Sequence, residues 1–171
     1  MGKTYALVCG GTKGSGRSNK LGTVDAYNSS LTRSIPTALT DVRTMHIGAS
    51  LSNYALIAAG SGATSGAYLS SVETYNTSLT KGTATSLTID RCWPGSAVVN
   101  DKAIFAGGYD YNFTDVSAAE SYDSSLTKLE TVDLGYSGSS GISGTYVGNY
   151  ALFAFATVAN NIPVISMKWE E

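Results

Sequence analysis

Apolar residues along this chain fall into short runs of five to seven positions, which is the length of β-strands rather than of helices. One kind of run is apolar at nearly every position, as expected for a strand covered on both faces, and occurs at residues 5–11, 54–60, 102–108 and 150–156. A second kind alternates, with an acid and a tyrosine on one face, at residues 23–27, 71–75 and 118–122. No stretch has a convincing amphipathic-helix spacing. The pattern predicts an all-β protein.

Both kinds of run recur at a fixed interval, together with a polar turn. Tyr-Asn-Ser-Ser-Leu-Thr-Arg at 27–33 returns 48 residues later at 75–81, as Tyr-Asn-Thr-Ser-Leu-Thr-Lys, and after another 47 residues at 122–128, as Tyr-Asp-Ser-Ser-Leu-Thr-Lys. Asn53, Asn100-Asp101 and Gly148-Asn149 separate the first and second strands of a unit and suit a tight hairpin. A period near 50 with four short strands per unit indicates the blades of a β-propeller.

The repeat also predicts the organisation of the chain. We expect a single domain over 1–171, with about three and a half repeats of 47–49 residues at approximately 1–45, 46–93, 94–140 and 141–171. The chain begins in a second strand and stops in a third, at 162–169, so two full blades stand between two partial ones. The fourth strand of each unit is expected to start at Leu31, Leu79 and Leu126. In the third unit, Gly138 replaces the arginine of the first two units, in a loose run from 135 to 144.

These repeats resemble the kelch family. The resemblance is carried by Gly-Gly at the end of the apolar strand, by the later Tyr-Asn or Tyr-Asp, and by Arg43 and Arg91 before a first strand. Where kelch repeats have a tryptophan after the tyrosine, this chain has leucine. The sequence Val-Asp-Ala-Tyr-Asn-Ser-Ser-Leu-Thr-Arg at 24–33 is similar to kelch-like arrays in phage and prophage structural proteins and in bacterial surface proteins.

The resemblance implies a non-enzymatic structural or binding module that presents variable loops to neighbouring proteins or to a host receptor. Its expected location is a virion, the cell surface or the extracellular space, reached without a classical signal peptide and after a cytoplasmic stage. The loops are residues 12–22, 61–70 and 109–117, and their aromatic side chains are candidate partner-binding residues: Tyr68, Tyr109, Tyr111 and Phe113. Packing within the loops explains these aromatics equally well. A carbohydrate-binding module that uses the loop tyrosines is the alternative, and a glycosidase or oxidase is a weaker one.

Composition and charge narrow the partners. The net charge of −2 and a charged fraction of 14% leave no basic surface for nucleic acid, and no apolar run approaches the roughly 18 residues of a membrane helix. Cys9 stands where the sister strands have alanine, and Cys92 lies in a different part of the repeat, so a disulfide is not expected. The chain has a single histidine, His46, which is too few for a histidine-based metal site. For the same reason the copper-radical site of some kelch oxidases is not expected here.

Two motifs favour structural roles over chemistry. Residues 11–18 approach a phosphate-binding loop, but Arg17 stands where lysine is required and a strand follows instead of a helix. Asp25, Glu73 and Glu120 repeat at one position on separate blades, whereas glycoside hydrolysis requires two carboxyl groups in one site. We expect these acids to accept hydrogen bonds from neighbours such as Arg43 and Arg91. We therefore expect no enzyme activity, cofactor or metal. The repeated structural positions are Tyr27, Tyr75, Tyr122, Asp25, Glu73, Glu120, Arg43 and Arg91.

The missing strands predict self-association. A propeller avoids exposed sheet edges by closing a ring, typically of four to eight blades, and this chain supplies too few strands for most of these. We expect a homo-oligomer, most simply a dimer that completes one propeller, in which the strand at 142–147 supplies the first strand that the first blade of a neighbouring copy lacks. A four-bladed or truncated monomer is the rival.

Overall fold

The computed structural model describes residues 4–14, 19–64, 67–135, 142–155 and 164–168. In this part of the chain every regular element is a β-strand and all strand pairs are antiparallel, which confirms the expected all-β class. The strands form four sheets that follow one another along the chain. Sheet 1 contains β1 (Tyr5–Cys9), β2 (Val24–Asn28) and β3 (Arg33–Ser34), and sheet 2 contains β4 (Ile47–Ser50), β5 (Tyr54–Ala58), β6 (Val72–Asn76) and β7 (Lys81–Ala84). Sheet 3 contains β8 (Gly95–Val99), β9 (Lys102–Ala106), β10 (Ala118–Tyr122) and β11 (Val132–Asp133), and sheet 4 contains β12 (Ser143–Val147), β13 (Tyr150–Ala154) and β14 (Val164–Lys168).

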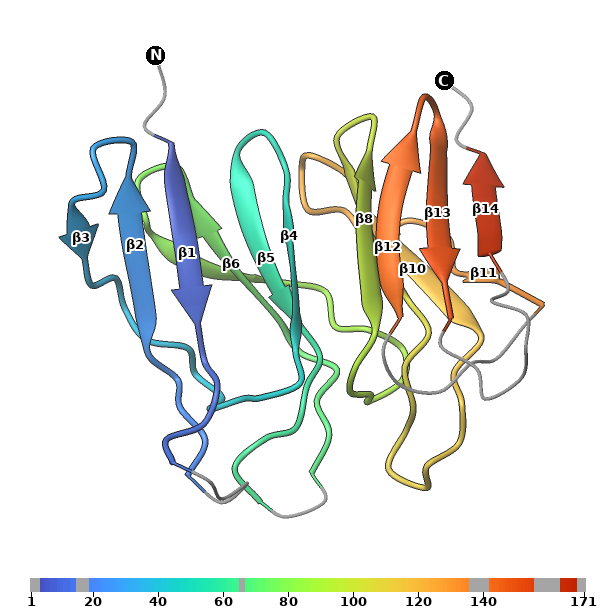
Figure 1. The fold of residues 1–171 in the computed structure, drawn as a ribbon, viewed down its shortest axis with the longest axis horizontal. Coiled ribbons are helices and arrows are strands. Elements are labelled where there is room, and N and C mark those ends of the chain that lie inside the picture. The colour runs from blue at the N-terminus through green and yellow to red at the C-terminus, as the bar shows by residue number, and fades with distance from the viewer. Residues whose placement is uncertain (1–3, 15–18, 65–66, 136–141, 156–163, 169–171) are drawn as a thin grey trace.

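The four sheets stand side by side in chain order, with sheets 1 and 4 at the two ends of the row (Figure 1). Within each sheet the strands are hydrogen-bonded in the order in which they occur in the sequence. The loops that join β1 to β2, β5 to β6 and β9 to β10 lie along one side of the row, the lower side in the view, and the two chain ends lie on the opposite side (Figure 1). The three variable loops of the sequence therefore share one side of the molecule.

Sheet 1 lacks the strand that corresponds to β4, β8 and β12. In the described part of the chain β1 pairs with β2 alone, whereas β5, at the same place in the repeat, pairs with both β4 and β6. Within the chain β12 pairs with β13 along one edge and is the edge strand of sheet 4, so the expectation that 142–147 supplies this strand to a second copy stays a prediction.

The polar turn of the repeat is built by its first residue. The side-chain Oδ1 of Asn28 accepts hydrogen bonds from the backbone N–H groups of Ser30 and Thr32, at 3.0 and 2.9 Å. Asn76 and Asp123 do the same in sheets 2 and 3. The leucine of each turn has a positive φ, between 58° and 64°, so it belongs to the turn. The expectation that the fourth strand starts at this leucine is therefore wrong; β3 and β7 start two residues later, and β11 starts at Val132.

Apolar side chains fill the spaces between successive sheets. Leu7, Val24, Leu39 and Ile57 pack between sheets 1 and 2. Leu56, Ala58 and Phe105 belong to the cluster between sheets 2 and 3, and Ile104, Phe153 and Phe155 to the cluster between sheets 3 and 4. Neighbouring positions on β5 therefore serve different contacts: Ile57 faces sheet 1, and Leu56 faces sheet 3. This explains why the run is apolar without alternation.

A buried arginine joins sheet 1 to sheet 2 and another joins sheet 2 to sheet 3. Arg43 is fully buried; its Nη2 donates to Glu73 Oε1 at 2.7 Å, and its Nη1 donates to the carbonyl oxygen of Ala59 at 3.1 Å. Arg91 and Glu120 repeat the pair at 2.6 Å, with both side chains fully buried. The arginines expected to pair with these acids thus do so in both inner sheets. Each acid also meets a lysine of its own sheet: Lys81 lies 3.0 Å from Glu73, and Lys128 lies 2.5 Å from Glu120.

Candidate functional site

Four aromatic side chains gather at the loop end of sheets 2 and 3, and we call them the aromatic cluster: Tyr68, Trp93, Tyr109 and Phe113. Tyr109 is the centre, since its ring centroid lies 5.7 Å from each of the other three. Tyr68 and Trp93 meet it edge to face, at 71° and 82°, and Phe113 stacks on it at 26°. Such contacts are each worth about 0.5–1.5 kcal/mol beyond area burial, so the cluster forms a preformed surface.

Backbone hydrogen bonds hold the cluster at the ends of strands. Cys92 and Tyr109 exchange two backbone hydrogen bonds, each of 3.1 Å, which fixes Tyr109 just beyond β9. Trp93 follows Cys92 with a φ of 54°, and its N–H donates to the carbonyl oxygen of Met45 at 2.9 Å. Burial raises the pKa of the Tyr109 phenol well above its usual value, and hydrogen bonds with Cys92 and Tyr68 raise it further. The phenol therefore stays neutral.

Phe113 is placed by a fourth copy of the repeat's polar turn. Asp110 Oδ1 accepts hydrogen bonds from the N–H groups of Asn112 and Thr114, at 2.8 and 2.9 Å. Phe113 has a φ of 58° and occupies the position that leucine has in the other three turns. The sequence carries a signal for this turn: Asp-Tyr-Asn-Phe-Thr at 110–114 matches Asp-Ser-Ser-Leu-Thr at 123–127 in its first aspartate and its final threonine.

The cluster combines a half-buried base with an exposed rim. Tyr68 and Tyr109 are half-buried, whereas Phe113 is 76% exposed and Trp93 is 37% exposed. Tyr111 is 64% exposed, and no ring in the described part of the chain contacts it. Three of the four loop aromatics expected from the sequence are thus brought together. Trp93, which sequence reasoning did not select, completes the group. Such a surface offers flat apolar contact to a partner.

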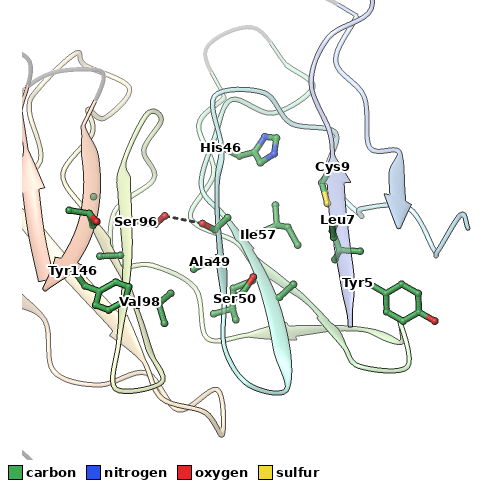
Figure 2. A pocket seen from close by; sticks show the side chains of 17 residues that line it. Tyr5, Leu7, Cys9, His46, Ala49, Ser50, Ile57, Ser96, Val98 and Tyr146 are labelled. Atoms are coloured by element: carbon green, nitrogen blue, oxygen red, sulfur yellow. Dashed lines mark hydrogen bonds between the residues drawn. The ribbon is translucent and has the colours of Figure 1, made fainter. Parts of the chain in front are cut away.

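A groove lies beside the first strands of the four sheets. This groove has a volume of about 660 Å³ and is lined by β1, β4, β5, β8 and β12. Tyr5 and Tyr146 lie on its opposite sides, and His46 lies towards one end (Figure 2). The Ser96 hydroxyl donates to the carbonyl oxygen of Gly48 at 2.9 Å. The groove follows the edge of β1 that β2 leaves unpaired.

The remaining candidate residues have structural surroundings. Asp25, Glu73 and Glu120 lie on β2, β6 and β10 of three different sheets, and the Asp25 carboxylate is 2.7 Å from Arg33. Burial of the Glu120 carboxylate opposes ionisation, but hydrogen bonds and charge from Lys128, Arg91 and Thr88 outweigh it and lower its pKa; Glu73 is lowered in the same way. The Glu73 and Glu120 carboxylates are therefore ionised and already bound by neighbouring side chains.

His46 and the two thiols are also accounted for by packing. Burial lowers the pKa of His46, and the charge of Arg43 lowers it further. Burial raises the pKa of the Cys9 thiol to about 11, and neither Cys9 nor Cys92 forms a disulfide with another described residue. In the described residues no group of three or more His, Cys, Asp or Glu side chains is placed to hold a metal ion.

The phosphate-loop motif is only partly described. Residues 15–18 lie outside the described residues, and the next regular element is β2, so no helix N-terminus follows the motif in the part of the chain that the structure covers. Gly138 also lies outside the described residues. Among the described residues, no helix has the length and apolar character needed to span a membrane.

Comparisons with known proteins reveal a similarity in fold alone. No family model matches the chain, and no curated protein matches it. Among solved structures, the chain is similar to one described as "Structure of YjhT", with a TM-score of 0.68 and 13% sequence identity. The match covers 90% of this chain and 58% of that one, so this chain spans somewhat more than half the length of its structural neighbour.

Proposed function

We propose that the chain is a kelch-like part of a β-propeller that acts as a non-enzymatic binding module, with the aromatic cluster as its recognition surface. Support for the propeller comes from the two four-stranded sheets, each ordered along the chain, and from the same Arg-to-Glu contact at two successive sheet junctions. The kelch resemblance of the sequence points the same way.

The observation that carries the recognition role is the packing of Trp93, Tyr109 and Phe113 at the end where the variable loops meet. A recognition surface of this kind needs rigid aromatic side chains with an exposed rim, because ordering flexible side chains on binding reduces affinity. In the kelch-like arrays that the sequence resembles, the setting is a phage particle or a bacterial surface. The proposed partner is therefore a protein of the same assembly or a receptor on a host cell.

A protein partner suits the cluster better than a sugar. Sugar sites combine a flat aromatic face with free polar groups at its rim. Here the Asp110 carboxylate already accepts two backbone hydrogen bonds inside its own turn, and the exposed atoms of Phe113 are apolar. Glycan recognition stays as the alternative that the experiment distinguishes.

The test compares binding of fluorescently labelled chain to intact bacterial cells, by flow cytometry, and to a glycan array. Trp93→Ser combined with Phe113→Ser removes the two most exposed aromatics of the aromatic cluster. Leu31→Ser is the matched control, since Leu31 is 80% exposed and occupies the position of Phe113 in the same kind of turn.

We expect the wild type and the control to bind cells of a host strain, and the aromatic double variant to bind at least roughly tenfold more weakly. Tight binding to one defined glycan, lost in the aromatic variant, would replace the protein-partner proposal by the lectin alternative. Equal cell binding by the aromatic variant and the wild type would refute a recognition role for the cluster.

A further inference from the structure

The two ends of the row of sheets expose faces that match the buried faces of its interior. Residues paired across neighbouring antiparallel strands lie on one face of the sheet, so the register defines each face. On sheet 1 the pairs Ala6–Tyr27, Val8–Asp25 and Tyr27–Arg33 define one outward face. On sheet 4 the pairs Thr145–Leu152, Val147–Tyr150 and Leu152–Ser166 define another. We call these the head face and the tail face.

The head face repeats surfaces that sheets 2 and 3 bury against the preceding sheet. Val8 corresponds to Ile57 and Phe105, which are 4% and 0% exposed, yet Val8 is 63% exposed. Tyr27 corresponds to Tyr75 and Tyr122, whose hydroxyls donate to the carbonyl oxygens of Thr37 and Thr85 in the preceding unit, both at 2.6 Å. No described residue forms a hydrogen bond with the Tyr27 hydroxyl. The head face thus has the same composition as an internal contact, but no sheet among the described residues covers it.

The tail face repeats the complementary surface. Val147 and Leu152 correspond to Leu51 and Leu56 of sheet 2, which are buried in the cluster facing sheet 3. Val147 is instead 59% exposed, and Tyr150 beside it is 41% exposed. The tail face is therefore the kind of surface that receives a head face inside the chain.

The acid on the head face needs no arginine from a second copy as its counter-charge. Where sheets 2 and 3 have a glutamate held by an arginine of the preceding unit, sheet 1 has the shorter Asp25, already paired with Arg33 of its own sheet at 2.7 Å. The junction between sheets 3 and 4 provides a precedent, because the sequence has Gly138 at the arginine position and Ile165 at the glutamate position. That junction is built around Ile104, Phe153 and Phe155.

From this complementarity we infer that the head face of one copy binds the tail face of a second copy, and that two copies close a ring through two such contacts. Head-to-tail contacts join unlike surfaces, so they produce either closed rings or open fibres. Four sheets per copy place eight in the ring, which is within the size range of propellers. The inference concerns assembly and does not depend on the recognition role of the aromatic cluster.

Sedimentation velocity on the 171-residue chain at micromolar concentration tests the inference. The expected particle has twice the chain mass of 17.7 kDa. Val8→Lys on the head face and Val147→Lys on the tail face each place a charge in both contacts of the ring, and each is expected to weaken association at least roughly tenfold. Tyr111→Lys is the matched control, since Tyr111 is 64% exposed and lies on a loop away from both faces; it is expected to leave the particle unchanged.

Mixing the two variants separates head-to-tail contacts from any symmetric pairing. In a mixed pair one contact combines the intact tail of the Val8→Lys chain with the intact head of the Val147→Lys chain. The mixture is therefore expected to associate more strongly than either variant alone. Far-ultraviolet circular dichroism verifies that each variant is folded, and Thr145→Lys, also exposed on the tail face, replaces Val147→Lys if that variant fails to fold.

Three results would overturn the inference. The first is a wild-type particle of one chain mass across the micromolar range, and the second is formation of open fibres. The third is a dimer unaffected by both face variants, or one whose mixture associates no better than the separate variants.

Discussion

The buried pair of Arg91 and Glu120 gives the sharpest prediction for stability. The Glu120 carboxylate is fully buried and accepts hydrogen bonds from Arg91 at 2.6 Å, from the Thr88 N–H at 2.9 Å, and from the Thr88 hydroxyl at 2.9 Å. Lys128 approaches it as well. Glu120→Gln keeps the volume of the side chain but removes the charge, which leaves the guanidinium of Arg91 buried without its counter-charge.

Removing one partner of a buried ion pair typically costs about 3–5 kcal/mol. We expect about 3 kcal/mol for Glu120→Gln, at the low end, because the amide oxygen of glutamine still accepts a hydrogen bond. The control is Asp25→Asn at the corresponding position of sheet 1, where the pair with Arg33 is exposed to water. Exposed pairs contribute about 0–1 kcal/mol, so this variant is expected to unfold almost like the wild type.

Urea unfolding followed by circular dichroism measures both free energies, provided that a second probe gives the same transition. The folded-state pKa of Glu120 is lowered, so its contribution is present above the ordinary glutamate pKa of about 4.3 and is lost as the pH falls through the folded value. Glu120→Gln should therefore also flatten the loss of stability in acid. Equal losses for Glu120→Gln and Asp25→Asn, or an unchanged acid profile, would refute the reasoning.

Two further predictions concern single residues. Because the pKa of His46 is lowered in the folded chain, protonation near the ordinary value of about 6.5 favours the unfolded chain, so stability should fall from pH 7 to pH 5 in the wild type. His46→Gln should remove most of that slope in urea titrations, and an identical slope in the variant would count against it. Gly144→Ala places a methyl group against the carbonyl of Ser96, and we expect a loss of about 1–3 kcal/mol. Gly48→Ala, at the corresponding position of sheet 2, meets only an ordinary contact 3.7 Å from the Leu56 carbonyl oxygen and should cost less than about 1 kcal/mol in the same assay; equal costs would contradict the expected crowding.

The sequence predicted the strands well because the repeat presents each strand type several times. A run such as Tyr-Ala-Leu-Ile-Ala is ambiguous alone, but its recurrence beside a turn and an alternating run indicates one kind of sheet. The error at Leu31 has a physical reason. An apolar residue after a polar turn suggests the start of a strand, but here the Asn28 side chain holds the turn for two more residues and gives the leucine a positive φ.

The candidate site was predictable only in part. Tyr68, Tyr109, Tyr111 and Phe113 were found because they lie in the loops that vary between units. Trp93 was missed because it precedes a strand and corresponds to Met45, so nothing in the repeat marks it as a loop residue. Its contact with Tyr109 depends on the close approach of two chain segments, which the backbone hydrogen bonds between Cys92 and Tyr109 establish in the folded chain.

The polar turn has a consequence for how such a protein can diversify. Its shape depends on the Asn or Asp side chain and on backbone groups, whereas the residue at positive φ is leucine in three copies and phenylalanine in the fourth. Leu31 and Phe113 both project into water, at 80% and 76% exposure. Mutations at these positions therefore alter the outer surface while leaving the scaffold intact. These two turns are sites at which new specificity can evolve, or be engineered, with little cost to folding.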